Sequence, residues 1–435
     1  MIITNFKNLA KSPLRKKALQ IVEAGYEAIN IEEAVKNKIE INKNKLLISN
    51  FTIDLNKYRK IFIIGIGKGS ALASATLAKI LGKKLDRCIA LDISKPPLNS
   101  KFLILNSEFL VGTHPFPSIQ NIKATKKIIE MVEKAGKDDL IISFICGGGS
   151  ALLCGSEKEL KASREIFSKL TNAGANIIEL NTIRKHLSEV KGGGLTKIAY
   201  PATMISLVVS DVFKNDLSMV ASGPTIYDKT TKKDAEKILS KFNTKYKILN
   251  IKYQLNETPK DKKYFKKVKN ILFISNCEPI TAMAKKAKKL GFSPKIYSYN
   301  LKGEARNILL PLIEAGKSGA AVISGGETTI VLGENPGKGG RNMEAVLGSI
   351  TNPRCPIPNN LITISFASDG KDNTEAAGAI GDILTINKAE KLKLDFEKYL
   401  KIHNTFNFFK KTGDLIFADK KTFNVSDLML VLKEK

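Results

Sequence analysis

Short apolar runs alternate along this chain with stretches of helical pattern, and most of the runs end directly in a cluster of glycine, serine, aspartate or charged residues. Such runs indicate buried strands, and their alternation with helices indicates largely parallel sheets. The expected strands are residues 61–67, 140–146, 204–210, 271–275, 320–324 and 361–367. The sequence therefore predicts an α/β fold. Because ligands bind at the carboxyl ends of strands in open α/β sheets, the clusters there are candidate sites.

The length of 435 residues indicates two domains, because one hydrophobic core seldom grows beyond about 250–300 residues. The segment from about 227 to 268 is polar and rich in lysine, and we expect the crossing between the domains near 235–268. The predicted domains are residues 1–240 and 241–435.

The formal net charge of +28 raises the question of nucleic-acid binding, but the pattern of the charges favours a solvated surface. The excess is almost entirely lysine, with 62 lysines against eight arginines, and it is spread along the chain. No basic run is interleaved with regularly spaced aromatic residues, and tryptophan is absent. We expect a cationic surface that attracts anionic metabolites, and no nucleic-acid partner.

Other residue types exclude further classes of protein. The five cysteines show no CxxC pairing and the three histidines are scattered, so we expect neither a zinc site nor a disulfide framework. The N-terminal residues lack the order of a secretory signal, and no apolar run reaches membrane-spanning length. We expect a cytoplasmic monomer or homodimer that acts on a small-molecule substrate and has no membrane partner.

The segment 322–344, VISGGETTIVLGENPGKGGRNME, contains the clearest candidate site. An expected strand ends at Ser324-Gly325-Gly326, and Gly337-Lys338-Gly339-Gly340-Arg341-Asn342 follows. Glycines let a ligand approach the main chain closely, and the amide groups of such turns form anion-binding concavities. Arg341 adds a planar fork suited to phosphate or carboxylate. The sequence predicts an anion-binding loop here.

Two more glycine clusters follow strands in the N-terminal half. Gly65-Ile66-Gly67-Lys68-Gly69-Ser70 only loosely resembles a dinucleotide loop and is not a Walker A loop, so a tight turn explains it equally well. Lys68 would lie at a helix N-terminus, where partial positive charge favours an anion. For Gly147-Gly148-Gly149-Ser150 we favour close approach to phosphate over a plain turn.

Charged side chains mark the remaining clusters. In residues 180–194, Arg184 and Lys191 are expected on a helix that glycines cap at its C-terminus. Asp211 and Asp369 each follow an apolar strand, where a carboxylate is costly unless it faces a cleft or binds a cation. Asp211 is a candidate magnesium ligand or general base, and capping of the next helix is the alternative. Carboxylates, cations and glycine turns together are the inventory of phosphoryl transfer.

These motifs resemble those of the two-domain glycerate kinases, a family related to a protein of tartrate degradation that carries a MOFRL-type C-terminal domain. The resemblance covers nearly the whole chain, in order and in spacing. It rests on GIGKGSA (65–71), HPFPS (114–118), GGGSALL (147–153), LNTIRKHLSEVKGGGL (180–195), SDVFKNDLSMVASGPT (210–225), SGGETT (324–329), GKGGRNMEA (337–345) and SDGKDNTEAAGA (368–379).

The resemblance implies a Rossmann-like three-layer N-terminal domain, a second α/β domain with a mixed sheet, and an active site in the cleft between them. It implies transfer of the ATP γ-phosphate to D-glycerate with Mg²⁺, most commonly giving 2-phosphoglycerate. Lys68, Asp211 and Arg341 match the residues usually proposed as catalytic, and Asp211 and Asp369 are the candidate metal ligands. The candidate residues for binding substrate or nucleotide are Gly67, Gly148, Gly149, Ser150, Arg184, Lys191, Gly325, Gly326, Glu327, Gly339, Gly340, Asn342 and Glu344.

The chain departs from the family pattern in places where activity could change. Phe213-Lys214-Asn215 replaces a glycine and a carboxylate beside Asp211, and the motif at 369–376 is one residue shorter than usual. Met343 replaces a glutamine, and glycines are missing from 417–428. These changes would alter substrate choice or nucleotide affinity, or mark a weakened enzyme.

Two alternatives stay open beside the kinase. A hydroxypyruvate reductase dependent on NAD(P)H would need a dinucleotide fingerprint with an acidic residue roughly 20 positions beyond the glycine loop. Asp86 lies in the right region, but the loop is imperfect. A non-catalytic homologue that binds nucleotide or sugar acid is suggested by the altered C-terminal motif.

Overall fold

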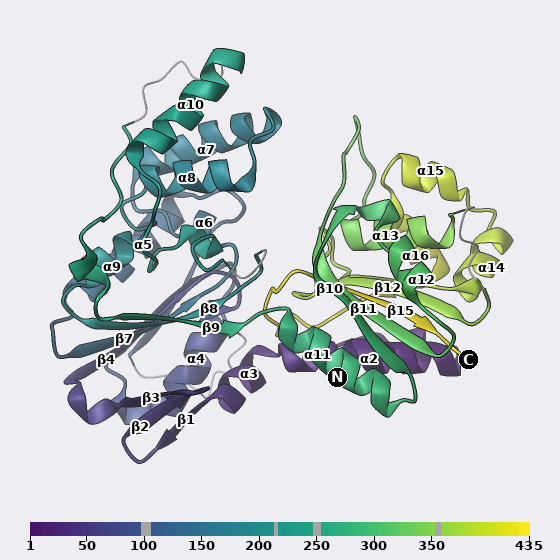
Figure 1. Ribbon diagram of the computed structural model, residues 1–435, viewed down its shortest axis with the longest axis horizontal. Coiled ribbons are helices and arrows are strands. Elements are labelled where there is room, and N and C mark those ends of the chain that lie inside the picture. The colour runs from purple at the N-terminus through teal and green to yellow at the C-terminus, as the bar shows by residue number, and fades with distance from the viewer. Residues whose placement is uncertain (97–105, 213–215, 247–253, 353–357) are drawn as a thin grey trace. The chain divides into compact units, whose positions relative to one another are not determined.

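The computed structural model describes residues 1–96, 106–212, 216–246, 254–352 and 358–435 (Figure 1). The chain forms two compact units: unit 1 comprises residues 1–33 and 274–435, and unit 2 comprises residues 34–273. This division differs from the predicted one at residue 240. Residues 1–33 pack with the C-terminal part of the chain, and residues 241–273 belong with unit 2.

The central sheet of unit 2 has the strand order β6-β5-β4-β7-β8-β9. Its strands are β4 (Lys60–Ile66), β5 (Arg87–Asp92), β6 (Ser107–Val111), β7 (Asp139–Ile145), β8 (Thr203–Val209) and β9 (Val268–Ile274). The neighbouring strands from β6 to β8 pair in parallel, and Ile64 of β4 lies opposite Ile89 of β5 and Ser143 of β7. Nearly every residue of β4 and β7 is buried, as expected for a parallel sheet with helices on both faces.

Helices cover both faces of this sheet, which gives unit 2 three layers. On one face, Gly65 of β4 lets the chain approach Ser74 of α4 closely. On the other face, apolar residues of α5 and α9 pack with Phe62 and Ile64 of β4. The helices are α3 (Ile31–Lys38), α4 (Ser70–Leu81), α5 (Ile119–Glu133), α6 (Gly149–Leu152), α7 (Glu157–Asn172), α8 (Ile177–Leu187), α9 (Gly194–Ala199) and α10 (Lys232–Tyr246). A small antiparallel sheet, β1 (Ile39–Asn42), β2 (Lys45–Ile48) and β3 (Phe51–Asp54), completes the unit.

Unit 1 contains a mixed sheet with the strand order β10-β11-β15-β12-β13-β14. Its strands are β10 (Ser293–Glu304), β11 (Ala320–Thr329), β12 (Leu361–Ala367), β13 (Gly378–Gly381), β14 (Leu415–Ile416) and β15 (Asp427–Lys433). β10 and β11 are parallel, and the other pairs are antiparallel. The prediction of two α/β domains, one with a Rossmann-like layered sheet and one with a mixed sheet, is confirmed.

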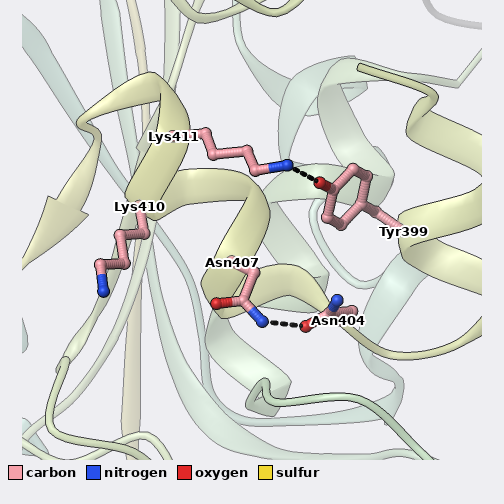
Figure 2. A pocket seen from close by; sticks show the side chains of 5 residues that line it. All are labelled: Tyr399, Asn404, Asn407, Lys410 and Lys411. Carbon is pink, nitrogen blue, oxygen red and sulfur yellow. Dashed lines mark hydrogen bonds between the residues drawn. The ribbon is translucent and has the colours of Figure 1, made fainter.

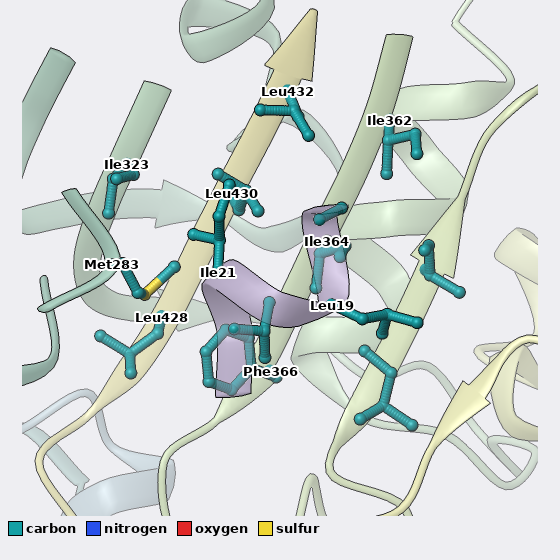
Figure 3. Packing of buried hydrophobic residues seen from close by; sticks show 14 of the residues in the cluster. Leu19, Ile21, Met283, Ile323, Ile362, Ile364, Phe366, Leu428, Leu430 and Leu432 are labelled. Atoms are coloured by element: carbon teal, nitrogen blue, oxygen red, sulfur yellow. The ribbon is translucent and has the colours of Figure 1, made fainter. Parts of the chain in front are cut away.

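The N-terminal helix α2 forms part of the core of unit 1. Figure 3 shows its residues Leu19 and Ile21 packed on apolar side chains of β11, β15 and β12, with Ile21 on the side toward Met283 of α11. Tyr26 at the end of α2 donates a hydrogen bond of 3.0 Å to the carbonyl of Ala367. These contacts explain why residues 1–33 belong to unit 1. The helices are α1 (Phe6–Leu9), α2 (Pro13–Ala28), α11 (Cys277–Lys289), α12 (Leu310–Ala315), α13 (Arg341–Ile350), α14 (Ile383–Lys391), α15 (Phe396–Lys401) and α16 (Thr405–Thr412).

Two elements end at places that the sequence did not predict. β11 continues through Gly325 and Gly326 to Thr329, because Gly326 pairs with Leu301 of β10 on one side and with Asp427 of β15 on the other. α8 ends at Leu187, so Lys191 lies in the turn that precedes α9. No helix within the described ranges has both the length and the apolar composition to cross a membrane.

Candidate functional site

The carboxyl ends of β4, β7 and β8 lie next to one another at one edge of the unit 2 sheet. From β4 the chain continues to β5 and β6 on one side, and it later adds β7 and β8 on the other side. The order of the strands therefore reverses between β4 and β7. In open α/β sheets this switch point is where ligands bind. The loops that follow these two strands contain Lys68 and Gly147–Ser150, two of the predicted clusters.

The turn Gly147–Gly149 packs so closely against the next loop that side chains would not fit. A Cβ atom on Gly147 would collide with the carboxylate of Asp211, which follows β8. A Cβ atom on Gly149 would lie 2.6 Å from the Cβ of Ala221. The missing side chains thus bring the Asp211 carboxylate against the main chain of the turn. The expected approach of a phosphate to this turn stays a prediction.

Lys68 and His114 flank Gly148, the middle residue of this turn. Gly148 has a φ of +79°, and a Cβ atom there would lie 3.3 Å from Lys68 Cγ and 3.4 Å from His114 Nε2. The main chain is held as well, because the Lys68 N–H donates to the Gly147 carbonyl over 2.9 Å. A Cβ atom on Gly67 would collide with the carbonyl of Cys146, so this glycine allows the β4 loop to approach the β7 loop.

Burial of the imidazole, and then the charges of Lys68 and Arg184, lower the pKa of His114 to about 4. The surroundings of the ring restrict its hydration even though residue 114 as a whole is exposed to solvent. Both cations act in the same direction, and His114 is therefore neutral at physiological pH. The shift also indicates that Lys68, His114 and Arg184 share one electrostatic environment.

Arg184 of α8 lies in this environment without a carboxylate partner among the described residues. Its guanidinium lies 4.5 Å from the ring centroid of Phe167 and donates to Asn181 Oδ1 over 3.3 Å. Burial lowers the pKa of Arg184, and no neighbouring anion opposes the shift. A partly buried guanidinium that no carboxylate of the described residues neutralises is suited to an anionic ligand.

Hydrogen bonds connect α8 to the glycine turn. Asn181 Oδ1 also accepts from Ser222 Oγ over 2.9 Å, and Ser222 Oγ lies 2.9 Å from Ser150 Oγ. Ser222 is fully buried, and both it and Ala221 have positive φ values, of 58° and 51°. Such values are uncommon for residues other than glycine and often occur near functional sites. The predicted residues Ser150 and Arg184 are thus linked through Asn181 and Ser222.

The N-terminus of α4 is already occupied by a carboxylate of the chain. Asp92, the last residue of β5, is buried and accepts a hydrogen bond of 3.1 Å from the Ala71 N–H. Burial raises the pKa of Asp92 to about 6, although its main-chain hydrogen bonds oppose the shift. The expectation that the positive end of α4 favours an external anion beside Lys68 needs correction, since Asp92 fills that position.

Lys191 also needs correction as a predicted binding residue. Its side chain is buried, donates to the Leu153 carbonyl over 2.7 Å and forms an ion pair with the buried Glu159. A lysine held in this way contributes to the packing of α7 against the turn before α9. It has no accessible ammonium group for a ligand.

In unit 1 a second cluster forms where the end of β11 meets the start of β15. Asp427 lies opposite Gly326 of β11 and Ala367 of β12. Its Oδ2 is 2.7 Å from Arg341 Nε, and an Arg341 terminal nitrogen is 3.0 Å from Glu327 Oε1. Asp427 is buried, whereas Glu327 is exposed, and 35% of the Arg341 side chain is accessible. Arg341 is therefore paired with one buried and one exposed carboxylate.

Asp372 caps the N-terminus of α13, directly behind Arg341. Its Oδ2 accepts the N–H groups of Asn342 and Met343, both over 2.9 Å. The Asn342 amide group also donates to Asp427 Oδ1 over 2.9 Å. Burial, and then the charge of Asp427, raise the pKa of Asp372 to about 7. Burial also raises the pKa of Asp427 to about 6, although Arg341 and Asn342 oppose the shift.

The glycine run before α13 packs against the chain itself. A Cβ atom on Gly337 would lie 2.5 Å from the Cβ of Asn404, and one on Gly339 would lie 2.5 Å from the carbonyl of His403. A Cβ atom on Gly340 would collide with Asp372. Close packing within unit 1 is therefore sufficient to explain this run. The predicted anion cradle reduces to the accessible face of the Arg341 guanidinium.

The other predicted binding residues of unit 1 lie inside the fold. Gly325 and Gly326 are within β11, and a side chain on Gly326 would collide with the main chain of Leu301. Glu344 is buried, and it pairs with Arg306 over 2.9 Å and with His403 Nδ1 over 2.8 Å. Asn342 is equally buried, with its amide bonded within the chain. These residues support Arg341 and the glycine run; their surroundings give no access to a ligand.

The two predicted metal ligands belong to different units, Asp211 to unit 2 and Asp369 to unit 1. Asp369 follows β12, and its Oδ1 accepts the Lys371 N–H over 3.2 Å. Over the described ranges, no group of three or more histidine, cysteine, aspartate or glutamate side chains is arranged to hold a metal ion. Mg²⁺ in phosphoryl transfer is usually bound by one or two carboxylates together with substrate phosphates. A single carboxylate such as Asp211 fits that mode of binding. The described residues do not form a magnesium site built from protein ligands alone.

A polar pocket in unit 1 adjoins the glycine run, because Asn404, which lines the pocket, packs against Gly337. Its volume is about 580 Å³, and it is lined by Tyr399, Asn404, Asn407, Lys410 and Lys411 (Figure 2). Lys411 donates to the Tyr399 hydroxyl over 2.8 Å, and Asn407 donates to Asn404 over 2.7 Å. None of the predicted site residues lines this pocket.

Sequence reasoning missed His114, Asp92, Asp372 and Asp427 as members of the two clusters. Asp92 and Asp427 each adjoin an apolar run, the same signal that singled out Asp211. Of the departures from the family pattern, 213–215 lies outside the described residues. Met343 is fully buried in the apolar core around α13, so the change from glutamine alters that core rather than the Arg341 cluster.

Comparison with known proteins adds family information to this geometry. A family model described as "Domain of unknown function (DUF4147)" matches residues 17–254, and the model of the MOFRL family matches residues 320–427. A D-glycerate 2-kinase of Thermotoga maritima is 31% identical, over 96% of this chain and 98% of the relative. A putative hydroxypyruvate reductase of Agrobacterium vitis is 32% identical, over 85% of this chain and 86% of the relative. The crystal structure of a glycerate kinase from Thermotoga maritima is similar with a TM-score of 0.79 and 29% identity, over 96% of this chain and 99% of that one.

Proposed function

The chain belongs to the two-domain glycerate kinase family and is a kinase, and we propose that it transfers the γ-phosphate of ATP to D-glycerate to give 2-phosphoglycerate. The observation that carries this proposal is the unit 2 cluster at the switch point. There, Lys68 and the Asp211 carboxylate lie against one glycine turn, and hydrogen bonds through Asn181 and Ser222 link Arg184 to Ser150 of that turn. No carboxylate of the described chain neutralises Arg184.

Each member of this cluster has a chemical task in the proposed reaction. Lys68 and Arg184 would hold the glycerate carboxylate and offset charge that develops on the transferring group. Asp211 would accept the proton of the attacking hydroxyl, as a general base within reach of the turn. The N–H group of Gly148 would bind a phosphate oxygen, whereas the Gly149 N–H donates to the Cys146 carbonyl over 3.3 Å.

Arg341 would contact the transferring phosphoryl group through its accessible face. Its ion pair with the exposed Glu327 contributes little, on the order of 0–1 kcal/mol, so an anion can displace Glu327. The ion pair with the buried Asp427 would persist and keep the guanidinium oriented. We predict that the unit 1 cluster and the unit 2 cluster serve the same reaction.

The proposed magnesium ion would arrive with the nucleotide. When bound, Mg²⁺ would neutralise charge on the nucleotide phosphates. As the alternative to its role as general base, Asp211 would help to bind this ion, since one or two carboxylates are enough when phosphates supply the remaining oxygens. Asp369 would be a second ligand only if its carboxylate bound the same magnesium ion as Asp211.

The surroundings of the first glycine loop argue against the reductase alternative. Asp86 accepts the Ile61 N–H over 2.7 Å at the amino end of β4, so it lies at the opposite edge of the sheet from the glycine loop. At the correct edge, Asp92 is buried against the N-terminus of α4, where a dinucleotide pyrophosphate would bind. We therefore do not favour a dinucleotide cofactor.

Coupled assays distinguish the candidates. We expect ADP formation that depends on D-glycerate, and no oxidation of NADH with hydroxypyruvate. Lys68→Ala is expected to abolish this ADP formation without loss of secondary structure. Near-normal turnover in this variant would remove Lys68 from the mechanism, and ATP binding without turnover on any hydroxy acid would favour a non-catalytic homologue.

A further inference from the structure

The loop that carries His114 is fixed to the glycine turn by one buried residue. Asn121, in the first turn of α5, is fully buried. Its Oδ1 accepts the Thr113 N–H over 2.9 Å and the Ser118 N–H over 3.1 Å, one on each side of His114. Its Nδ2 donates over 3.2 Å to the carbonyl of Leu152, at the end of α6. Asn121 thus holds the loop and the turn in a fixed relation.

This arrangement places the His114 ring at the centre of the unit 2 cluster. The Nε2 edge of the ring lies over Gly148, beside Lys68: a Cβ atom on this glycine would lie 3.4 Å from His114 Nε2 and 3.3 Å from Lys68 Cγ. A neutral imidazole has one N–H donor and one acceptor nitrogen, so it can hydrogen-bond a carboxylate without adding charge. The proposed mechanism gives this ring no task.

We propose that His114 is a further substrate-binding residue, which hydrogen-bonds the anionic group held by Lys68 and Arg184, and that Asn121 positions it. The identity of that group as the carboxylate of a small hydroxy acid rests on the proposed function. The anion site itself rests on the geometry around Gly148.

Bound anion has a measurable consequence for His114. In the free protein Lys68 and Arg184 oppose protonation of the ring, and an anion between them cancels part of their field, so the pKa of His114 must rise on binding. The chain has only three histidines, so all of them can be followed by NMR. His186 and His403 are buried and serve as internal controls, because their rings are bonded to Asn256 and Glu344.

The experiment is a pH titration of the histidine ring signals of the full chain, alone, with D-glycerate and with inorganic phosphate. We expect the pKa of His114 to rise by about one unit or more with at least one of the two anions, while His186 and His403 do not respond. If neither anion moves His114, the inference is wrong, whether or not the enzyme phosphorylates glycerate. If the wild-type enzyme turns over no hydroxy acid but phosphate moves His114, the proposed function fails and the anion site stands.

Kinetics of variants provide the second readout. His114→Ala is expected to raise KM for D-glycerate about 10- to 100-fold, the effect of losing one hydrogen bond to a charged group, with KM for ATP unchanged. His114→Gln is expected to recover much of the loss, since its amide reaches the position of Nε2. An equal rise in KM for both substrates, or no rise for glycerate, would contradict a role in binding the acid.

Discussion

Replacing Arg341 with alanine is expected to destabilise unit 1 in a manner that depends on pH. The substitution removes the guanidinium 2.7 Å from the buried Asp427 and leaves that carboxylate beside Asp372, which is also buried. Breaking a buried ion pair by removing one partner costs about 3–5 kcal/mol. Arg341 is 35% accessible, so solvent weakens the pair, and we expect a loss of about 1–3 kcal/mol at pH 8.

The sign of the pH dependence follows from the direction of the shift. Burial already raises the pKa of Asp427 to about 6, so its contribution to stability is fully present below the unfolded pKa and is lost as the pH rises through 6. Without Arg341 the folded pKa rises further, and more stability is lost at high pH. Below about pH 4 Asp427 is protonated in both states, and the variant should approach wild-type stability.

Urea denaturation at pH 5 and pH 8 measures the difference. The double variant Arg341→Ala/Asp427→Asn is the matched control, because it removes the charge that Arg341 neutralises. We expect it to recover most of the stability at pH 8 while turnover stays low. An equal loss at both pH values, or no recovery in the double variant, would refute the reasoning. At pH 5, where Arg341→Ala should be nearly as stable as the wild type, a loss of turnover cannot be due to unfolding of the variant.

Two further substitutions test the packing around the unit 2 cluster. Gly147→Ala should displace the Asp211 carboxylate, lower kcat and reduce the unfolding free energy by about 1–3 kcal/mol. Gly333→Ala is the control, because a Cβ atom there meets nothing within 4 Å, and it should change neither quantity. A wild-type kcat for Gly147→Ala would show that Asp211 has no part in catalysis. Lys191→Met should lower the unfolding free energy by about 3–5 kcal/mol, because Glu159 is left buried without its ion-pair partner. Adding Glu159→Gln should restore both stability and turnover. A stable Lys191→Met variant with a raised KM would instead show that Lys191 binds a substrate.

The edges of the sheets at which the clusters form could be predicted from the sequence. Apolar runs locate β4, β7, β8 and β12, and the residues that follow them include Lys68, Asp211 and Asp369. Hydrophobic runs are local, and for β4, β7 and β8 the parallel order that brings their ends together follows from general rules of α/β folds. β12 lies in the other sheet, where it is antiparallel to β13 and β15. The confirmed part of the prediction therefore depends on local pattern.

The roles of the glycine runs could not be predicted in the same way. A missing Cβ is needed both when a ligand approaches the main chain and when another segment of the chain does. Gly148 has Lys68 and His114 beside it, whereas Gly337 has Asn404, 67 positions later in the sequence. The sequence alone does not show which segment of the chain, or which ligand, will approach a given glycine.

Buried partners were also hidden from the sequence. Lys191 pairs with Glu159, 32 residues earlier, and nothing local marks either residue as buried. Asp369 and Asp372 look alike as sequence, three residues apart in one polar loop. Asp372 is the one that is buried, because it caps the N-terminus of α13, and its burial depends on where α13 packs.

The most direct test of the proposed reaction is the ³¹P NMR spectrum of the product formed from ATP, Mg²⁺ and D-glycerate. Carbon 2 of glycerate carries one hydrogen and carbon 3 carries two, so the ester phosphorus couples to one proton in 2-phosphoglycerate and to two in 3-phosphoglycerate. We expect a doublet that forms only with glycerate present and is absent with Lys68→Ala. A triplet would assign the other hydroxyl, and the absence of any glycerate-dependent ester would contradict the proposed function.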